Sequence, residues 1–92
     1  MENAVRLHVF FEGFVQGVGF RYTAVHISRD FDVAGFVRNL SDGRVELVAE
    51  GDAKEVRGFV GRIREVMRRY IHQATVTEES PSGEFDSFRI TY

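Results

Sequence analysis

Alternating hydrophobic and polar positions near the start of the chain indicate the first stretch of regular structure. In residues 5–11 every second residue is apolar and would line one face of a strand: Val5, Leu7, Val9 and Phe11. A period of two is typical of a strand that buries one face. We therefore expect the first strand at residues 5–11.

A helix is predicted after the glycine-rich segment from Gly13 to Gly19. Beyond it, apolar residues recur at helical spacing: Phe20, Ala24, Ile27 and Phe31. This spacing places them on one face of a helix, which would pack against a sheet. We expect this helix at about residues 20–31.

A hairpin and a second helix follow. Strands are expected at residues 35–40 and 44–50, joined by a turn at Ser41–Gly43 in which the glycine can adopt a positive φ. Asp52 is a typical N-cap residue, and apolar residues at helical spacing continue until near Tyr70. We expect the second helix between these two residues.

The remaining strands complete the order of elements. Residues 72–78 are rich in residues that favour strands, and residues 88–92 alternate again after a loop. The order β-α-β-β-α-β, with an added strand at the carboxyl end, predicts an α+β protein with the ferredoxin-like α/β plait, in which two helices pack on one face of an antiparallel sheet. In this topology the first two strands run parallel and end at the same edge of the sheet. The segment Gly13–Arg21 and Asn39 would then lie close together.

Length and composition narrow the class of protein. A chain of 92 residues has room for one hydrophobic core, so we expect residues 1–92 to form a single domain. No apolar run approaches the ~18 residues of a membrane-spanning helix, and we expect a soluble, cytoplasmic monomer with no membrane partner. The chain has no Cys, which excludes disulfides and thiol chemistry. Its net charge of −2 offers no broad basic surface, so we expect no nucleic-acid partner.

The glycine-rich segment before the first helix is a candidate anion-binding loop. Its glycines let several backbone N–H groups turn toward one point, and the positive end of the helix dipole adds to the attraction for an anion. Arg21 lies in the first turn, where the dipole disfavours a cation, and its guanidinium fork matches phosphate oxygens. From the residues alone, the loop is equally consistent with a tight turn, and Arg21 with a solvated helix residue.

A second segment, taken with the first, carries a family resemblance. Val15–Arg21 and Gly35–Asn39 together resemble the two signature segments of the acylphosphatase family, in the same order and at the same spacing. Further matching positions follow the second segment: Gly43, Val45 and Gly51. The resemblance extends over residues 5–92.

The resemblance implies an enzyme that hydrolyses the carboxyl-phosphate anhydride of acyl phosphates, without a metal, another cofactor or a covalent intermediate. Arg21 and the backbone amides of the loop would bind the phosphate, and the loop residues are Gln16, Gly17, Val18, Gly19 and Phe20. Asn39 would orient the attacking water. The partner is then a small-molecule acyl phosphate, with inorganic phosphate as product and inhibitor. Because a carboxylate is a good leaving group, positioning and electrostatic stabilisation can supply most of the catalysis.

Two positions depart from the family pattern. Phe14 stands where many relatives carry a basic residue, and it could contact the acyl group of the substrate. Residues 69–72 replace the Gly-Pro element that is common before the fourth strand. Neither departure falls on a residue matched to catalysis.

Other functions remain open at this point. RNA-recognition domains share the order of elements, but they carry exposed aromatic residues on the third strand, whereas residues 44–50 contain no aromatic residue and two acids. A domain that binds phosphate or acyl phosphate without turnover would keep the same loop. His8, His26 and His72 lie on three expected elements without ligand spacing, so we expect no metal site.

Overall fold

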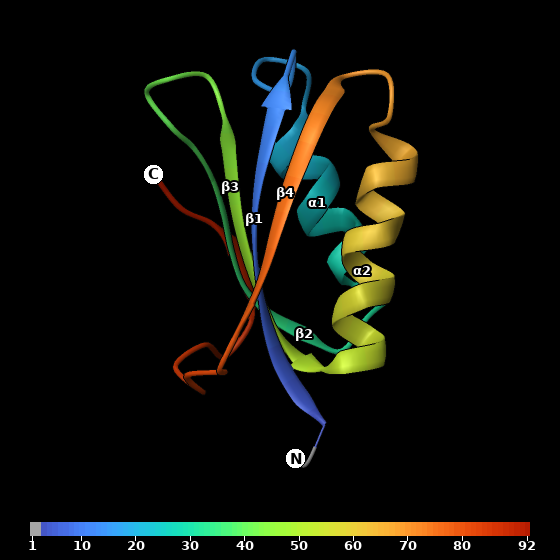
Figure 1. The fold of residues 1–92 in the computed structure, drawn as a ribbon, viewed down its shortest axis with the longest axis vertical. Helices are drawn as coiled ribbons and strands as arrows, with labels where there is room; N and C mark the ends of the chain where they lie inside the picture. Colours follow the sequence, from blue (N-terminus) through green and yellow to red (C-terminus); the bar gives the residue numbers. More distant parts are fainter. Residues whose placement is uncertain (1–2) are drawn as a thin grey trace.

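The computed structural model describes residues 3–92, which form a five-stranded sheet with both helices on one face (Figure 1). The elements in chain order are β1 (Ala4–Gly13), α1 (Phe20–Ser28), β2 (Val33–Asn39), β3 (Val45–Asp52), α2 (Ala53–Val66), β4 (Ile71–Glu79) and β5 (Phe88–Ile90). This order, including the added strand at the carboxyl end, confirms the prediction from the sequence pattern. None of the helices within these residues is long and apolar enough to cross a membrane.

The sheet has the strand order β4-β1-β3-β2-β5. The four strands from β4 to β2 pair antiparallel, as expected for the ferredoxin-like plait. The prediction of an antiparallel sheet is wrong for the last strand, because β5 pairs parallel with β2 and makes the sheet mixed. The reason is topological. β1 and β2 finish at one end of the sheet, and β4 finishes at the other end. A strand that starts where β4 finishes and pairs at the far edge must therefore run in the same direction as β2.

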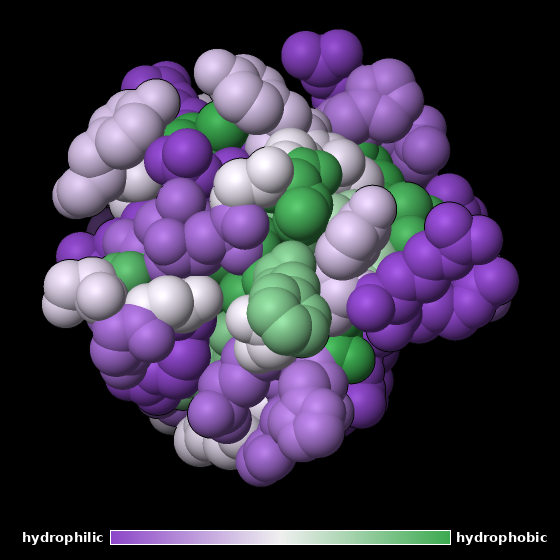
Figure 2. Space-filling model, turned by 90° about the horizontal axis from the view of Figure 1, so that it is seen from above, coloured by the Kyte–Doolittle hydropathy of each residue, from purple (hydrophilic) through white to green (hydrophobic). Residues whose placement is uncertain are grey.

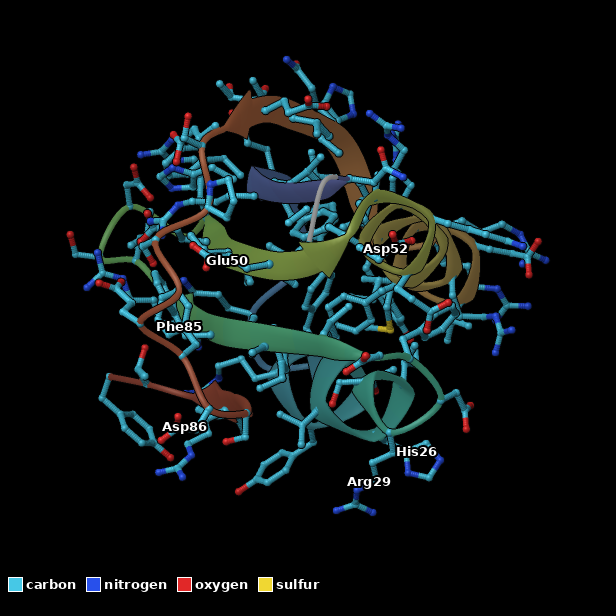
Figure 3. All side chains as sticks on the ribbon, turned by 90° about the horizontal axis from the view of Figure 1, so that it is seen from below. His26, Arg29, Glu50, Asp52, Phe85 and Asp86 are labelled. Carbon is cyan, nitrogen blue, oxygen red and sulfur yellow. The ribbon has the colours of Figure 1, made fainter. Side chains whose placement is uncertain are left out.

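Alternation along β1 places its apolar side chains against the helices. Leu7, Val9 and Phe11 are buried there, as the pattern predicted. The central strand β3 is buried on both faces, and on the face away from the helices its buried residues include Glu46 and Glu50. Figure 3 shows Glu50 on this open face, beside the segment that leads to Phe85.

The helices end earlier than the apolar periodicity suggested. α1 stops at Ser28 rather than near Phe31, because the amides of residues 29–31 bond to carbonyls three residues back and the chain turns away. α2 stops at Val66 rather than Tyr70, and turns occupy the residues between them. Its start agrees with the prediction, since the Asp52 side chain accepts a hydrogen bond from the Lys54 amide at 3.1 Å.

Candidate active site

The first two strands bring two separate parts of the sequence to one end of the molecule. β1 ends at Gly13 and β2 ends at Asn39, and the two strands run in the same direction. The loop that follows β1 and the turn that follows β2 therefore lie at the same end, at the top of Figure 1. Figure 2 looks down on this end and shows apolar residues in the middle of it with hydrophilic residues around them.

Buried residues at both ends of the loop hold it in place. Val15 is fully buried and Phe20 is 2% exposed, and both belong to the hydrophobic core. Between them, Gly17 and Gly19 have φ values of 79° and 75°, a left-handed conformation that glycine adopts without steric cost. The loop therefore alternates between residues fixed in the core and glycines with a left-handed backbone.

The end of this loop is also the N-terminus of α1. Gly19 is the N-cap, and it offers no side chain to satisfy the free amides of the first turn. No acidic residue lies in that turn to neutralise the positive end of the helix dipole. An anion placed here would meet unsatisfied N–H groups and a favourable field.

A small cavity lies where these features meet. Its volume is about 110 Å³, compared with the ~10–15 Å³ that one water requires. The residues that line it are Val15, Gly17, Gly19, Phe20, Arg21, Tyr22 and Asn39. The cavity thus joins the two segments that the sequence analysis singled out.

Arg21 supplies a cation to the cavity. Its side chain is partly exposed and forms no ion pair with any residue from 3 to 92. The guanidinium carbon lies 5.5 Å from the centre of the Tyr92 ring, a distance at which a cation is attracted to an aromatic face. The guanidinium N–H groups remain available for an anion.

Asn39 contributes a polar atom without a partner. Its Oδ1 is the one buried side-chain oxygen or nitrogen in the described part of the chain that has no hydrogen bond. Buried polar atoms are nearly always paired, and an unpaired acceptor that lines a cavity indicates a missing donor. A water or a ligand hydroxyl in the cavity would supply that donor.

The structure separates the residues expected at the site into two groups. Gly17, Gly19, Phe20, Arg21 and Asn39 line the cavity. The other two do not: the Gln16 side chain bonds to carbonyls of the β2–β3 turn, and Val18 packs against the core.

Two tyrosines lie at the site, whereas Phe14 does not. Phe14 is 84% exposed and does not line the cavity. Tyr22 does line it, and Tyr92 lies against Arg21. The sequence carried no signal for the two tyrosines, because neither belongs to a recognisable pattern.

Other hollows and clusters lack this combination of groups. Openings of about 620 and 410 Å³ lie beside the start of α2 and between α2 and β4, and no helix N-terminal glycine loop borders either. We place the candidate site in the cavity of about 110 Å³ because the N-terminus of α1, a cation and an unpaired carbonyl oxygen meet there. Within residues 3–92 no group of three or more His, Asp or Glu side chains is arranged to hold a metal ion.

Comparisons with known proteins show which family the chain belongs to. A model of the Acylphosphatase family matches residues 7–90. An acylphosphatase from Syntrophus aciditrophicus is 43% identical over 88 residues, which cover 95% of this chain and 92% of that protein. One from Roseiflexus sp. is 40% identical over the full length of both chains. The crystal structure of acylphosphatase from Bacillus subtilis superimposes with a TM-score of 0.85 at 31% identity, covering 96% of this chain and 99% of that one. Because the family model, the relatives and the solved structure all match over nearly the whole length of this chain, the chain belongs to the acylphosphatase family.

Proposed function

We propose that the protein hydrolyses acyl phosphates to a carboxylate and inorganic phosphate in the cavity between the loop and Asn39. The observation that carries the proposal is the convergence in one cavity of left-handed glycines, a free guanidinium and an unpaired buried carbonyl oxygen. Membership of the acylphosphatase family supports the reaction class.

The phosphate group is held by the loop and by Arg21. The backbone amides of residues 16–20 donate to the phosphate oxygens, as the free N–H groups of a helix N-terminus do for anions generally. The Arg21 guanidinium donates two parallel hydrogen bonds and balances the negative charge. These donors stay with the phosphoryl group as charge shifts onto its oxygens, so they stabilise the transition state without reorganising.

Asn39 positions the water. Its Oδ1 accepts a hydrogen bond from the water, and the water oxygen attacks phosphorus in line with the bond to the carboxylate. That P–O bond breaks, its electron pair leaves with the carboxylate, and the proton lost by the water passes to a phosphate oxygen or to solvent. The carboxylate is a weak base, so the reaction needs no strong general acid.

One assay tests the proposal. The protein should hydrolyse benzoyl phosphate at the same rate with and without a chelator, because hydrogen bonds from the amides and the charge of the guanidinium stabilise the phosphate without a metal. Inorganic phosphate should inhibit competitively, since it offers the same oxygens to the same donors. Phosphate binding without turnover would identify a silent binding domain, and a chelated enzyme revived by Mg²⁺ would refute the metal-free mechanism.

A further inference from the structure

The Gln16 side chain connects the phosphate loop to the β2–β3 turn. Its Nε2 donates to the Leu40 carbonyl at 2.7 Å and to the Arg44 carbonyl at 2.9 Å. A side-chain amide nitrogen carries two hydrogens, so both are used in these bonds. The Gln16 side chain therefore has no donor left for a phosphate.

The two carbonyls that Gln16 contacts belong to the residues that close the turn. The Leu40 amide donates to the Arg44 carbonyl at 2.8 Å, and the Gly43 amide donates to the Leu40 carbonyl at 3.2 Å. Asn39 comes immediately before this closure and pairs with Val45 on β3. Gln16 thus forms a hydrogen bond with the turn at Leu40, one residue beyond Asn39.

The consequence is a direct link between the two halves of the site. The loop carries the amides and leads into Arg21, whereas Asn39 stands on a different strand that is held to β3. Within residues 3–92, the bonds from Gln16 are the hydrogen bonds that join residues 14–19 to residues 39–44. Core packing of Val15 sets the general position of the loop, and Gln16 sets its relation to the turn.

We propose that Gln16 is a positioning residue, which fixes the water on Asn39 relative to the phosphate held by the loop. This inference rests on the proposed function. Catalysis by orientation is sensitive to geometry, and a displacement of about 1 Å can cost on the order of 10²-fold in rate. Loss of the hydrogen bonds from Gln16 should therefore slow the chemical step far more than it weakens phosphate binding. The groups that bind the phosphate, the loop amides and Arg21, all belong to the same segment and keep their relative positions.

The first test is Gln16→Met, which keeps a long, unbranched side chain and removes both donors. Phosphate affinity should stay within about three-fold of the wild type while kcat falls by about ten-fold or more, as expected when a reactant is released from its orientation. Asp42→Ala is the matched control. The Asp42 carboxylate accepts from the Arg44 amide and guanidinium at 3.1 and 2.8 Å, so its loss weakens the same turn without touching the link. It should lower Tm and leave kcat near the wild-type value.

A double-mutant cycle with Asn39→Ala shows whether Gln16 acts through Asn39. In the Asn39→Ala background, Gln16→Met should lower kcat by less than two-fold further, since the water is already free. Additive losses would overturn the inference, and so would equal losses of phosphate affinity and kcat in the single variant. An unchanged kcat in Gln16→Met would overturn it as well.

A measurement that needs no turnover separates this inference from the proposed function. In NMR spectra, Gln16→Met should shift the Asn39 side-chain amide signals of the folded protein, whereas Asp42→Ala should leave them in place. In the wild type, the Gln16 side-chain amide protons should exchange slowly with solvent. Inactive wild-type protein with these signatures would refute the proposed function alone, and rapid exchange or unshifted Asn39 signals would refute the link.

Discussion

At the scale of single residues, Arg21 and Asn39 offer the cavity two different chemistries. Arg21 is partly exposed, charged and close to the Tyr92 ring, and in the proposed mechanism it binds the phosphate group of both substrate and product. Asn39 is neutral, and its buried Oδ1 accepts no hydrogen bond from any described residue. We therefore expect substitutions of the two residues to separate binding from catalysis.

Arg21→Gln should abolish measurable phosphate binding and turnover together. The change removes the charge and the two-pronged contact, while the fold should persist because Arg21 has no ion pair within residues 3–92. Arg21→Lys should recover little, because an ammonium lacks the planar fork. Titration with phosphate and steady-state kinetics check this, and a Lys variant near wild-type activity would show that charge alone suffices.

Asn39→Ala should keep phosphate affinity within a few-fold and lower kcat by ~10²-fold or more, the scale expected when an oriented reactant is released. The competing interpretation is that Asn39 only stabilises the turn after β2. In that case the substitution would lower Tm and spare kcat. Phosphate affinity, kcat and Tm measured on one preparation distinguish the two, and a folded variant with near wild-type kcat would exclude the water-positioning role.

At the scale of elements, the loop between β1 and α1 depends on two left-handed glycines. An added Cβ at Gly19 would meet no atom within 4 Å, so the demand on this position is conformational rather than steric. The φ of 75° is one that an L side chain resists, and in the proposed mechanism this backbone shape turns the loop amides toward the phosphate. Close packing therefore does not require a glycine here, and we attribute its presence to the proposed phosphate site.

Gly19→Ala should destabilise the fold by about 1–2 kcal/mol, the cost of a left-handed residue with a side chain, and should weaken phosphate binding. Gly61→Ala is the control, because Gly61 lies inside α2 with equally open space and an ordinary helical φ. It should stabilise the protein by about 0.5–1 kcal/mol and leave activity unchanged. Denaturant unfolding and phosphate titration check both; a Gly19 variant that binds phosphate normally would contradict the assigned role.

Local patterns predicted most elements, but they could not predict how distant elements contact one another. The period of two in β1, the glycines of the loop and the Asp52 cap are each encoded within a few residues. The bonds from Gln16 to residues 40 and 44 and the parallel pairing of β5 with β2 join segments distant in sequence. Strand direction follows from the order of elements, so the sequence predicts that the loop and Asn39 lie at one end, whereas the contacts of the Gln16 side chain depend on packing that no local pattern shows.

At the scale of the whole molecule, a charged network covers the face of the sheet opposite the helices. Arg6 on β1 contacts Glu50 on β3 at 2.8 Å and Glu79 on β4 at 2.9 Å. His8 lies between Glu46 at 2.6 Å and Glu79 at 3.2 Å. The network thus connects three neighbouring strands on a face that no helix covers.

The segment between β4 and β5 is hydrogen-bonded to this network through Glu50. The amides of Ser82 and Gly83 and the Ser82 hydroxyl all donate to its carboxylate at 2.9 Å. Burial opposes ionisation and raises the pKa of Glu50. The hydrogen bonds from Ser82, Arg6 and Gly83 act in the opposite direction and prevail, so the pKa of Glu50 lies below its usual value. The ionised carboxylate therefore helps to lead the chain across the open face to β5.

Glu50→Gln should lower the free energy of unfolding at pH 7 by about 1–3 kcal/mol, because the amide presents an NH₂ group to donors that need an acceptor. The sign of the pH dependence follows from the lowered pKa. Ionised Glu50 stabilises the fold above the unfolded-state pKa of ~4.3, and the contribution disappears as the pH falls through that value and then through the folded-state pKa. The difference in unfolding free energy between the wild type and the variant should therefore decrease as the pH falls from about 6 to about 3.

Glu84→Gln is the control for this last prediction. Glu84 lies 3.8 Å from the same Arg6 group, but its side chain is 61% exposed, so its loss should change stability by less than about 0.5 kcal/mol at any pH. Urea unfolding of the three proteins between pH 3 and pH 7 provides the comparison. If the loss of unfolding free energy in Glu50→Gln stayed constant across this range, the ionised carboxylate would not be the group that holds residues 82 and 83 in place. Other contacts would then position the segment that leads to β5.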